Sequence, residues 1–389
     1  MIIRIALACV FLFSSFTKAV DPVNFGIKID EYFISFGMGF MHPLSQFIAI
    51  CAICCEFMLG CMMLIRIKMK LTSLFYLLFM GFFFLLTLWL AVAENLELHH
   101  GYNFGVVKDC GCFGQAVKLS NLQTFLKNVI IIIPTIVLFI QRKKIPDVRL
   151  TDLGQWTAVA ISFAIVLCFQ LYCIHHLPVI DFTNWKKGSY VVKDFIEEPA
   201  QKDVMFIYKS KVDNSTVALT QDELMSKDDN FYNSYDYVDR KDSIIKPLVR
   251  AKIDGFNMLD ENGADHAYEL INPDNTQNLY VLFIHDLDEV NAKGLAKAKI
   301  LAADCAKKNV TFVAITNTEP KDIEKFAKSN QITFPIYYNP IDPIKGPFMV
   351  RDAVRSNPGI ILFQKGTVID KWAWRDFPAT AEAQPQAKK

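Results

Sequence analysis

The sequence carries almost no net charge, because 41 lysines and arginines stand against 40 aspartates and glutamates. A chain with a formal charge of +1 has no bulk electrostatic attraction for polyanions, so we expect no nucleic-acid partner. Cysteine is nearly missing from the second part, where Cys305 is the only one of ten that follows residue 177. That part therefore relies on no internal disulfide, and the chain is not a small disulfide-dense scaffold.

Apolar residues make up 52% of the chain, and the long apolar runs all lie before residue 178. A helix needs about 20 mainly apolar residues to cross a bilayer. The stretches that meet this length are Ile2–Val20, Leu44–Ile65, Leu71–Ala93, Leu122–Ile140 and Trp156–Leu177. We therefore predict an integral membrane protein with five spans and the lipid bilayer as a partner. The first run also has the charged start and short apolar core of a cleaved signal peptide.

Two basic clusters predict the orientation of the spans. Arg66, Lys68 and Lys70 follow the second span, and Arg142-Lys143-Lys144 follows the fourth, so both clusters lie on one side. Short loops rich in lysine and arginine stay in the cytoplasm. We expect a cytoplasmic N-terminus in the inner (cytoplasmic) membrane, with the loop Glu94–Leu119 and residues 178–389 in the periplasm, an oxidising compartment.

The loop between the third and fourth spans contains Asp109-Cys110-Gly111-Cys112-Phe113-Gly114. Glycine accepts positive φ angles, so the backbone between Cys110 and Cys112 can bend sharply. A disulfide between them closes a very small ring, and strained disulfides are oxidising. Each sulfur could instead pair with a helix cysteine. The candidates for such pairing are Cys51, Cys54, Cys55 and Cys173. A redox-active pair and a structural disulfide are both open on these grounds.

Four histidines on the outer side of the predicted topology supply a rival interpretation, two before the cysteines in the same loop and two at the end of the fifth span. They are His99, His100, His175 and His176. Two thiolates and two imidazoles suit zinc or copper. Their spacing matches no specific zinc pattern, however, and histidine also anchors helices at a membrane surface. We therefore assign no metal ligand, and metal binding stays an alternative.

Glu56 lies well inside the second span. A carboxylate in hydrocarbon is costly and is a functional candidate by default. It is able to relay protons, to contact a quinone head group, or to sit protonated against Ser14 or Ser15 as a packing group. Lys18 is close to the end of the first span, and we expect it to extend its amine to the membrane surface. The segment Asp21–Met41 is mixed in character and is expected to be an exposed, partly helical loop.

Three short motifs resemble the DoxX and MauE membrane families. They are Phe11-Leu12-Phe13-Ser14-Ser15-Phe16-Thr17-Lys18-Ala19-Val20-Asp21-Pro22, Glu56-Phe57-Met58-Leu59-Gly60 and Cys110-Gly111-Cys112-Phe113-Gly114. The resemblance covers about residues 1–145 and implies a four-helix membrane domain, related in layout to quinone-linked proteins that form disulfides. It implies a quinone as cofactor and maturation of periplasmic proteins as role. The fifth helix, within 146–178, and the outer part resemble longer DoxX-type proteins of Bacteroidetes.

The outer part divides into a β-rich linker subdomain over 179–254, an α/β domain over 255–378 and a disordered tail over 379–389. In the linker we predict a hairpin of Val204–Tyr208 with Thr216–Leu219, followed by a loop over Ser226–Asp242. A second hairpin is expected to pair Ala251–Leu259 with Ala267–Ile271. From residue 278 on, strands and helices alternate and a hairpin ends the domain, which resembles the TlpA-like branch of the thioredoxin fold. The motif Ser356-Asn357-Pro358-Gly359 would then hold a cis-proline.

The expected thioredoxin-like domain departs from its family at the start of its first helix, where the redox-active cysteines would lie. A thioredoxin-type oxidoreductase needs Cys-x-x-Cys where its first helix begins, because the helix N-terminus stabilises the thiolate. Here the chain reads His285-Asp286-Leu287-Asp288-Glu289, without cysteine, and Cys305 is expected in the core. We therefore expect a redox-inactive domain that binds a periplasmic protein or peptide.

These observations leave three functional hypotheses. The first is a quinone-linked thiol–disulfide oxidoreductase with Cys110, Cys112 and Glu56 as catalytic residues. The second is a non-enzymatic envelope scaffold, in which the cysteines only staple the loop and the outer domain binds a protein partner. The third is a metal-handling protein. The redox state of Cys110 and Cys112 would separate them.

Overall fold

The structure is a computed structural model, and it describes residues 1–100, 104, 107, 110–117, 119–195, 201–246, 251–253, 255–341 and 348–382. The chain forms two compact units. The first combines Met1–Ser189 with Asn257–Lys389, and the second is Tyr190–Phe256. The first unit holds a bundle of long helices and an α/β part.

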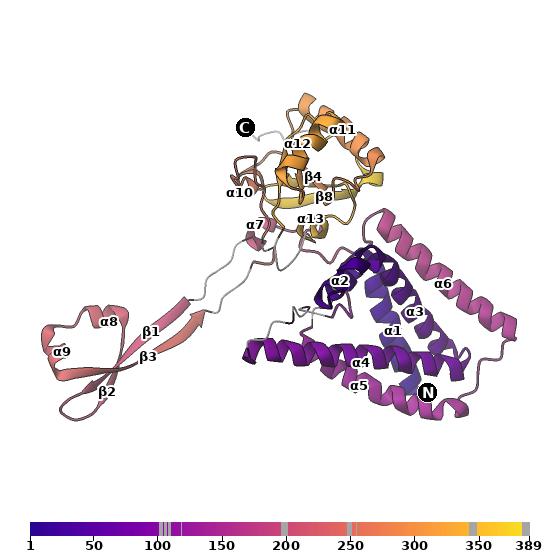
Figure 1. Ribbon diagram of the computed structural model, residues 1–389, viewed down its shortest axis with the longest axis horizontal. Coiled ribbons are helices and arrows are strands. Elements are labelled where there is room, and N and C mark those ends of the chain that lie inside the picture. Colours follow the sequence, from indigo (N-terminus) through magenta and orange to yellow (C-terminus); the bar gives the residue numbers. More distant parts are fainter. Residues whose placement is uncertain are drawn as a thin grey trace. The chain divides into compact units, whose positions relative to one another are not determined.

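Long apolar helices build the bundle, as predicted (Figure 1). They are α1 (Ile2–Val20), α3 (Ser45–Ile65), α4 (Met69–His100), α5 (Asn121–Gln141) and α6 (Asp152–His175), with the short 3-10 helices η1 (Gly39–Leu44) before α3 and η2 (Arg142–Lys144) after α5. Within the described residues, five helices are long and apolar enough to cross a membrane. The five predicted spans are therefore confirmed by length and composition.

Local capping fixes where two of these helices begin. The Ser120 hydroxyl accepts a hydrogen bond from the Gln123 amide, and the Gln123 side chain accepts one from the Ser120 amide, which is a capping box at the start of α5. The Thr151 hydroxyl accepts from the Gly154 amide at the start of α6. Both caps lie directly before apolar runs, so the helices begin where the spans begin.

The segment expected as an exposed loop is instead helix α2 (Pro22–Ser35). Asp21 caps it by accepting a hydrogen bond from the Asn24 amide at 3.1 Å. The prediction of exposure was wrong because Phe25, Ile29 and Phe33 recur every four residues and form one apolar face. Phe25 is buried together with residues of α1 and α3.

The basic clusters meet at one end of the bundle, which we call the basic end. Arg4 donates to the carbonyls of Met63 and Leu64 at the end of α3. Lys68 pairs with Asp152 at 2.5 Å and joins the start of α4 to the start of α6. The helices therefore alternate in direction, and the Cys110–Cys112 loop lies at the opposite end, which we call the disulfide end.

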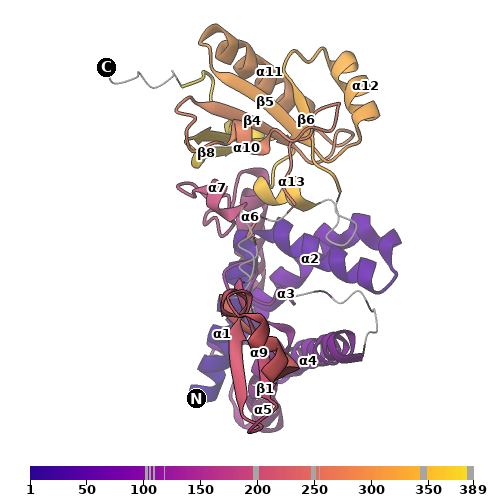
Figure 2. The same cartoon turned by 90° about the vertical axis from the view of Figure 1, so that its left-hand side faces the viewer.

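The α/β part contains a mixed sheet (Figure 2). Its elements are α10 (Ala267–Leu270), β4 (Leu279–Ile284), α11 (Ala292–Lys307), β5 (Thr311–Thr316), α12 (Pro320–Asn330), β6 (Ile336–Tyr338), α13 (Phe348–Ala353), β7 (Gly359–Gln364), β8 (Thr367–Ala373) and the 3-10 helix η3 (Trp374–Asp376). The strand order is β6-β5-β4-β7-β8, parallel from β6 to β4 and antiparallel from β4 to β8. The predicted alternation of strands and helices is confirmed.

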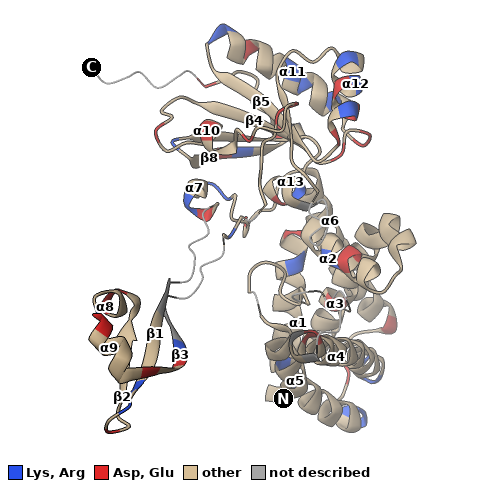
Figure 3. Ribbon diagram, turned by 60° about the vertical axis from the view of Figure 1, so that its left-hand side comes forward, with Lys and Arg blue, Asp and Glu red and all other residues tan. Residues whose placement is uncertain are grey.

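The central strand β4 explains the position of the α/β core. All six of its residues are buried, as expected for a strand covered on both faces. Tyr280, Leu282 and Ile284 pack with α11, while Phe283 faces Trp185 at a ring distance of 5.9 Å. Charged residues, by contrast, lie on the outer helices α11 and α12, and the bundle helices carry few (Figure 3).

The turn before β7 contains the expected cis peptide bond, between Asn357 and Pro358. Asn357 makes two hydrogen bonds in this turn. Its carbonyl accepts from the Asn291 amide, and its side chain donates to the Asp286 carbonyl. Cys305 is fully buried in α11, as expected, and burial raises the pKa of its thiol to about 12.

The second unit is a small antiparallel sheet. It comprises α7 (Val191–Asp194), β1 (Gln201–Ser210), β2 (Thr216–Thr220), α8 (Gln221–Met225), α9 (Asp229–Ser234) and β3 (Tyr235–Lys246), with strand order β2-β1-β3. The predicted hairpin of β1 and β2 is confirmed. The loop predicted over Ser226–Asp242 was wrong, because β3 pairs with β1 and places Tyr237 across from Tyr208.

The second predicted hairpin was also wrong. Ala267 begins the short helix α10, because the Asp265 carboxylate accepts hydrogen bonds from the amides of Met258 and Ala267. Leu259 forms only isolated bridges, to Asp265 and Tyr338. Of the tail predicted over 379–389, residues 383–389 lie outside the described residues, and Ala381 is buried against the α/β core.

Candidate functional site

Cys110 and Cys112 are joined by a disulfide. Their Cα atoms lie 5.5 Å apart, across Gly111, whose φ of +65° makes the bend that glycine permits. All other cysteines of the chain, Cys51, Cys54, Cys55 and Cys173 among them, are free thiols. Neither Cys110 nor Cys112 therefore forms a disulfide with a cysteine of the helices.

The two sulfurs have different surroundings. Cys110 is 3% exposed and packs with Leu90 and Val107 in an apolar cluster. Cys112 packs against the same cluster, but it is half-buried and also lines a small cavity. The difference matters for disulfide chemistry, because access decides which sulfur an incoming thiolate attacks.

The loop is fixed to α1 at two points. The Ser14 hydroxyl donates a hydrogen bond of 2.7 Å to the Cys112 carbonyl. Gly114 has a φ of +54°, and a Cβ atom there would lie 3.2 Å from the Thr17 carbonyl oxygen. Glycine at this position therefore serves both the turn and the close approach to α1.

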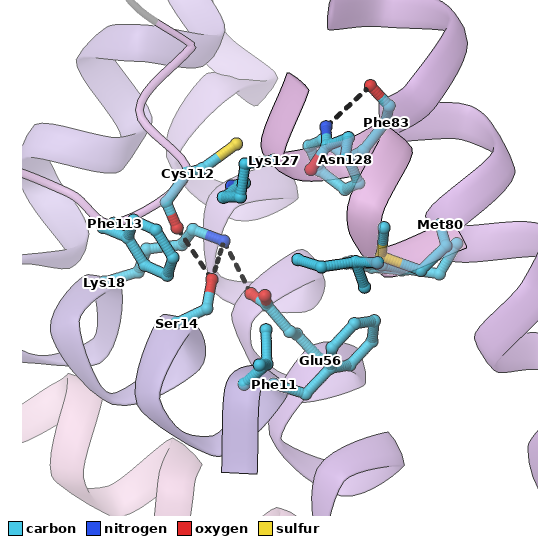
Figure 4. Close-up of a pocket in the computed structure, with 13 residues that line it drawn as sticks. Phe11, Ser14, Lys18, Glu56, Met80, Phe83, Cys112, Phe113, Lys127 and Asn128 are labelled. Carbon is cyan, nitrogen blue, oxygen red and sulfur yellow. Dashed lines mark hydrogen bonds and ion pairs between the residues drawn. The ribbon is translucent and has the colours of Figure 1, made fainter. Parts of the chain in front are cut away.

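Glu56 forms a buried ion pair with Lys18 inside the bundle (Figure 4). The Lys18 amine lies 2.6 Å from a Glu56 oxygen, and the two side chains are 3% and 5% exposed. The expectation that Lys18 extends to the membrane surface was wrong, because the carboxylate offers the amine a partner in the interior. Charges inside a membrane bundle commonly pair in this way.

The Glu56 and Gly60 motif has a geometric meaning. The two residues are four apart on α3 and share one face of the helix. A Cβ atom on Gly60 would lie 2.9 Å from the Leu12 side chain, so glycine lets α3 and α1 approach closely. This approach brings Glu56 within reach of Lys18 on α1.

A chain of hydrogen bonds connects this ion pair to the disulfide loop. Lys18 also donates to the Ser14 hydroxyl at 3.1 Å, and Ser14 in turn donates to the Cys112 carbonyl. Ser14 is thus linked to Glu56 only through Lys18. Ser15, the other expected neighbour of Glu56, instead donates to the Leu12 carbonyl.

Lys127 is a site residue that the sequence interpretation missed. It lies on α5, and its amine is 4.4 Å from the centre of the Phe113 ring, next to Cys112 in the chain. Its neighbour Asn128 donates to the Thr87 hydroxyl and the Phe83 carbonyl, which holds α5 against α4. The available signal was a lysine within an apolar span, the same argument that singled out Glu56.

These groups surround one cavity at the disulfide end (Figure 4). Its volume of about 30 Å³ is enough for about one or two water molecules. The lining residues are Val10, Phe11, Ser14, Lys18, Glu56, Phe79, Met80, Phe83, Cys112, Phe113, Lys127, Asn128 and Ile131. Two lysines and one glutamate therefore face a largely apolar space beside a disulfide.

The α/β part contacts the same end of the bundle. The Arg355 guanidinium, from the loop before the cis-proline, lies 3.0 Å from the Asp21 carboxylate, and both side chains are buried. Asp21 also accepts from the Asn24 amide, and the Asn24 side chain accepts from Gln115, which lies just after the disulfide. Arg355 is thus connected to the disulfide loop through three residues.

The metal alternative finds little geometric basis. Within the described residues, no three His, Cys, Asp or Glu side chains come together in a group able to hold a metal ion. His176 pairs instead with Asp376, at 2.8 Å. The side chain of His100 lies outside the described residues.

At the place where Cys-x-x-Cys would precede α11, the Asp286 carboxylate accepts from the amides of Asp288 and Glu289. Asn291 caps the helix itself. Burial, together with the nearby Arg351 and Arg355, lowers the pKa of His285 to about 3. These residues shape a turn and a helix start.

Comparison with known proteins finds a family match for the first part of the chain. Residues 1–141 match the family model described as methylamine utilisation protein MauE. This region is MauE-like. The MauE-like region contains α1 to α5, with Glu56, Lys18, Lys127 and both loop cysteines. No curated protein and no solved structure matches the chain.

Proposed function

We propose that this membrane protein is a thiol–disulfide oxidoreductase that introduces disulfides into periplasmic proteins. The observation that carries the proposal is the Cys110–Cys112 disulfide, held at one end of the MauE-like bundle beside a buried ion pair. A disulfide with one half-buried sulfur is open to attack by a thiolate.

The exchange follows from the two environments. A thiolate of a dithiol substrate attacks the Cys112 sulfur, the Cys110–Cys112 bond breaks, and Cys110 leaves and takes up a proton in its apolar cluster. The second substrate thiolate then attacks the substrate sulfur of the mixed disulfide, and Cys112 leaves. The substrate loses two electrons and gains a disulfide, while the cysteine pair gains two electrons and becomes a dithiol.

A membrane quinone is the proposed electron acceptor that restores the disulfide. A quinone ring is larger than the cavity of about 30 Å³ beside Cys112, so the cavity does not enclose one in this conformation. No quinone is therefore placed in this cavity, and reoxidation of Cys110 and Cys112 on addition of quinone tests the acceptor. Glu56 acts in this proposal as the partner of Lys18 that supports the loop through Ser14.

We further propose that the protein lies in the inner membrane with its basic end in the cytoplasm. The asymmetry of lysine and arginine between the two ends supports this orientation. The α/β part is proposed to be a thioredoxin-like domain without Cys-x-x-Cys. Its strand order β6-β5-β4-β7-β8 supports that assignment, and it would recruit the periplasmic protein that the loop oxidises.

The test traps thiols in intact membranes with a mass-shifting alkylating reagent, before and after addition of a reduced dithiol protein. We expect Cys110 and Cys112 to become alkylated as the substrate gains its disulfide, and to be reoxidised when quinone is supplied. Cys112→Ser should abolish the exchange, whereas Cys9→Ser, at an exposed position on α1, should not.

The alternative is a scaffold whose disulfide only staples the loop. The buried Arg355–Asp21 pair favours it, because that pair ties the α/β part to the bundle. A disulfide that stays closed with every dithiol protein, while folding and membrane insertion are normal, would support the scaffold and reject the oxidoreductase.

A further inference from the structure

The cavity beside Cys112 holds more positive than negative charge. Lys18 projects from α1, Glu56 from α3 and Lys127 from α5, whereas α4 contributes only the uncharged Phe79, Met80 and Phe83. Lys18 is neutralised by Glu56, with which it forms an ion pair at 2.6 Å. No ion pair or hydrogen bond joins Lys127 to any residue that the structure describes.

Lys127 is positioned toward the disulfide loop. Its amine lies over the Phe113 ring at 4.4 Å, and Phe113 directly follows Cys112. Both Lys127 and Cys112 line the same small cavity, and the Ser14 hydrogen bond fixes the Cys112 carbonyl (Figure 4). A charge in this apolar space interacts much more strongly with a second charge than it would in water.

The oxidised and reduced states differ in the charge that they offer Lys127. A disulfide carries no charge, so the favourable neighbours of the Lys127 ammonium are the face of Phe113 and, across the cavity, the Glu56 carboxylate, which already pairs with Lys18. Reduction releases Cys112 as a thiolate, which is an anion at the wall of the same cavity. A cation that is half-buried in an apolar site is less favourable unpaired than paired with an anion.

We propose that Lys127 is the counter-ion of the Cys112 thiolate and thereby favours reduction of the Cys110–Cys112 disulfide. The inference rests on the proposed function and deepens it, because it names the group that makes the disulfide oxidising. Stabilising the reduced form of a cysteine pair turns its disulfide into a stronger oxidant. A nearby lysine also keeps a cysteine ionised at lower pH.

The same arrangement assigns different roles to the two cysteines. Cys112 is half-buried and beside the cation, so it forms the mixed disulfide with substrate and leaves as a thiolate. Cys110 is buried inside an apolar cluster and Cys112 only packs against it, so the protonated thiol is favoured more strongly at Cys110. Glu56 prevents Lys18 from competing for the thiolate, which leaves this task to Lys127.

The first experiment equilibrates the full-length protein in detergent with a series of glutathione redox buffers. Alkylation and mass spectrometry then measure the fraction of the Cys110–Cys112 disulfide. We expect Lys127→Met to make the disulfide at least tenfold harder to reduce, and Lys127→Arg, which keeps the charge, to stay near wild type. Lys143→Met, at the basic end, is the matched control for loss of a lysine.

The second experiment needs no disulfide and no substrate. In a Cys110→Ser background, the rate of Cys112 alkylation is measured as a function of pH, with and without Lys127→Met. We expect the midpoint of the reactive form to rise by at least one pH unit when Lys127 is replaced. An unchanged midpoint would overturn the proposal even if the protein oxidises substrates.

The two experiments separate the inference from the function on which it rests. If the substrate dithiol never opens the disulfide but the alkylation midpoint still shifts, the oxidoreductase fails and the Lys127–Cys112 pairing stands. If exchange proceeds and neither the redox equilibrium nor the midpoint responds to Lys127→Met, the pairing fails alone. If Lys127→Met and the protein with Lys127 are recovered equally in monodisperse form, a folding defect does not explain the change in redox equilibrium or in alkylation midpoint.

Discussion

At the scale of single residues, Lys18 and Glu56 support each other. Neither is tolerable alone inside the bundle, because removing one partner of a buried pair leaves an uncompensated charge. The pair also positions Ser14, which holds the disulfide loop. Their chemistry is therefore tied to the loop through structure and not through contact with a sulfur.

We predict that Glu56→Gln destabilises the bundle by about 3–5 kcal/mol, since it leaves the Lys18 ammonium buried without a carboxylate. The measurement is unfolding in mixed micelles with increasing denaturing detergent. Lys18→Met together with Glu56→Gln should recover much of the loss. As a control, Asp152→Asn removes the exposed partner of Lys68 and should cost less than about 1 kcal/mol. Equal losses at the two sites would contradict the buried pairing.

Single residues also mark the limit of what the sequence predicts. Glu56 was recognisable because a carboxylate within an apolar span is costly unless it has a partner, and it is therefore a functional candidate. Its partner could not be recognised from the sequence, because Lys18 lies near the end of its span, where a long side chain normally reaches the membrane surface. The amine turns inward because α1 and α3 approach closely near Gly60 and place the Glu56 carboxylate within its reach.

At the scale of elements, the disulfide loop depends on its fit against α1. Gly114 combines a positive φ with a 3.2 Å approach to the Thr17 carbonyl, whereas Gly37 has a similar φ of +70° and open space around it. The two glycines thus separate the effect of backbone conformation from that of close packing.

Gly114→Ala should therefore weaken the packing of the loop against α1 by more than the free-energy cost of the backbone conformation alone. That penalty is about 1–2 kcal/mol for a left-handed residue with a side chain, and Gly37→Ala should suffer only this part. The measurement is the rate at which a fixed concentration of a phosphine reduces the Cys110–Cys112 disulfide. We expect faster reduction in Gly114→Ala and an unchanged rate in Gly37→Ala. An equal rate in both variants would argue against packing on α1.

Elements differ in how well the sequence predicts them. The five apolar helices and the strands β4 to β8 follow from length and local pattern, since both signals lie within each segment. The burial of helix α2 was missed because charged residues alternate with the apolar ones along the sequence, among them Lys28 and Glu31, which pair with each other at 2.8 Å. Strand β3 is polar, and only its pairing with β1 makes it a strand.

At the scale of the whole molecule, the Arg355–Asp21 pair joins the α/β part to the MauE-like bundle. The two residues are 334 positions apart in the chain. Arg355 also donates to Asp352 and to the Arg351 carbonyl, so its guanidinium is held from both parts. The connection from Asp21 through Asn24 to Gln115 then reaches the disulfide loop.

We predict that Arg355→Met loosens the disulfide loop at a distance. Hydrogen exchange of peptides covering residues 110–117 should accelerate about tenfold or more, equivalent to about 1.4 kcal/mol, because Asp21 loses its buried partner. Lys187→Met removes an exposed ion pair with Asp370 on the same α/β part and serves as the control. Exchange that rises only within the α/β part would show that the two parts are not coupled through Asp21.

The division into two units also orders the synthesis of the protein. The first unit is interrupted by Tyr190–Phe256, so its two pieces are made at different times. At about 5–20 residues per second, the ribosome spends several seconds on the inserted unit before the α/β part begins to emerge. The ion pair between Asp21 and Arg355 cannot form during that interval. The bundle helices are therefore synthesised several seconds before Arg355, and the Asp21–Arg355 contact forms only after the α/β part has emerged.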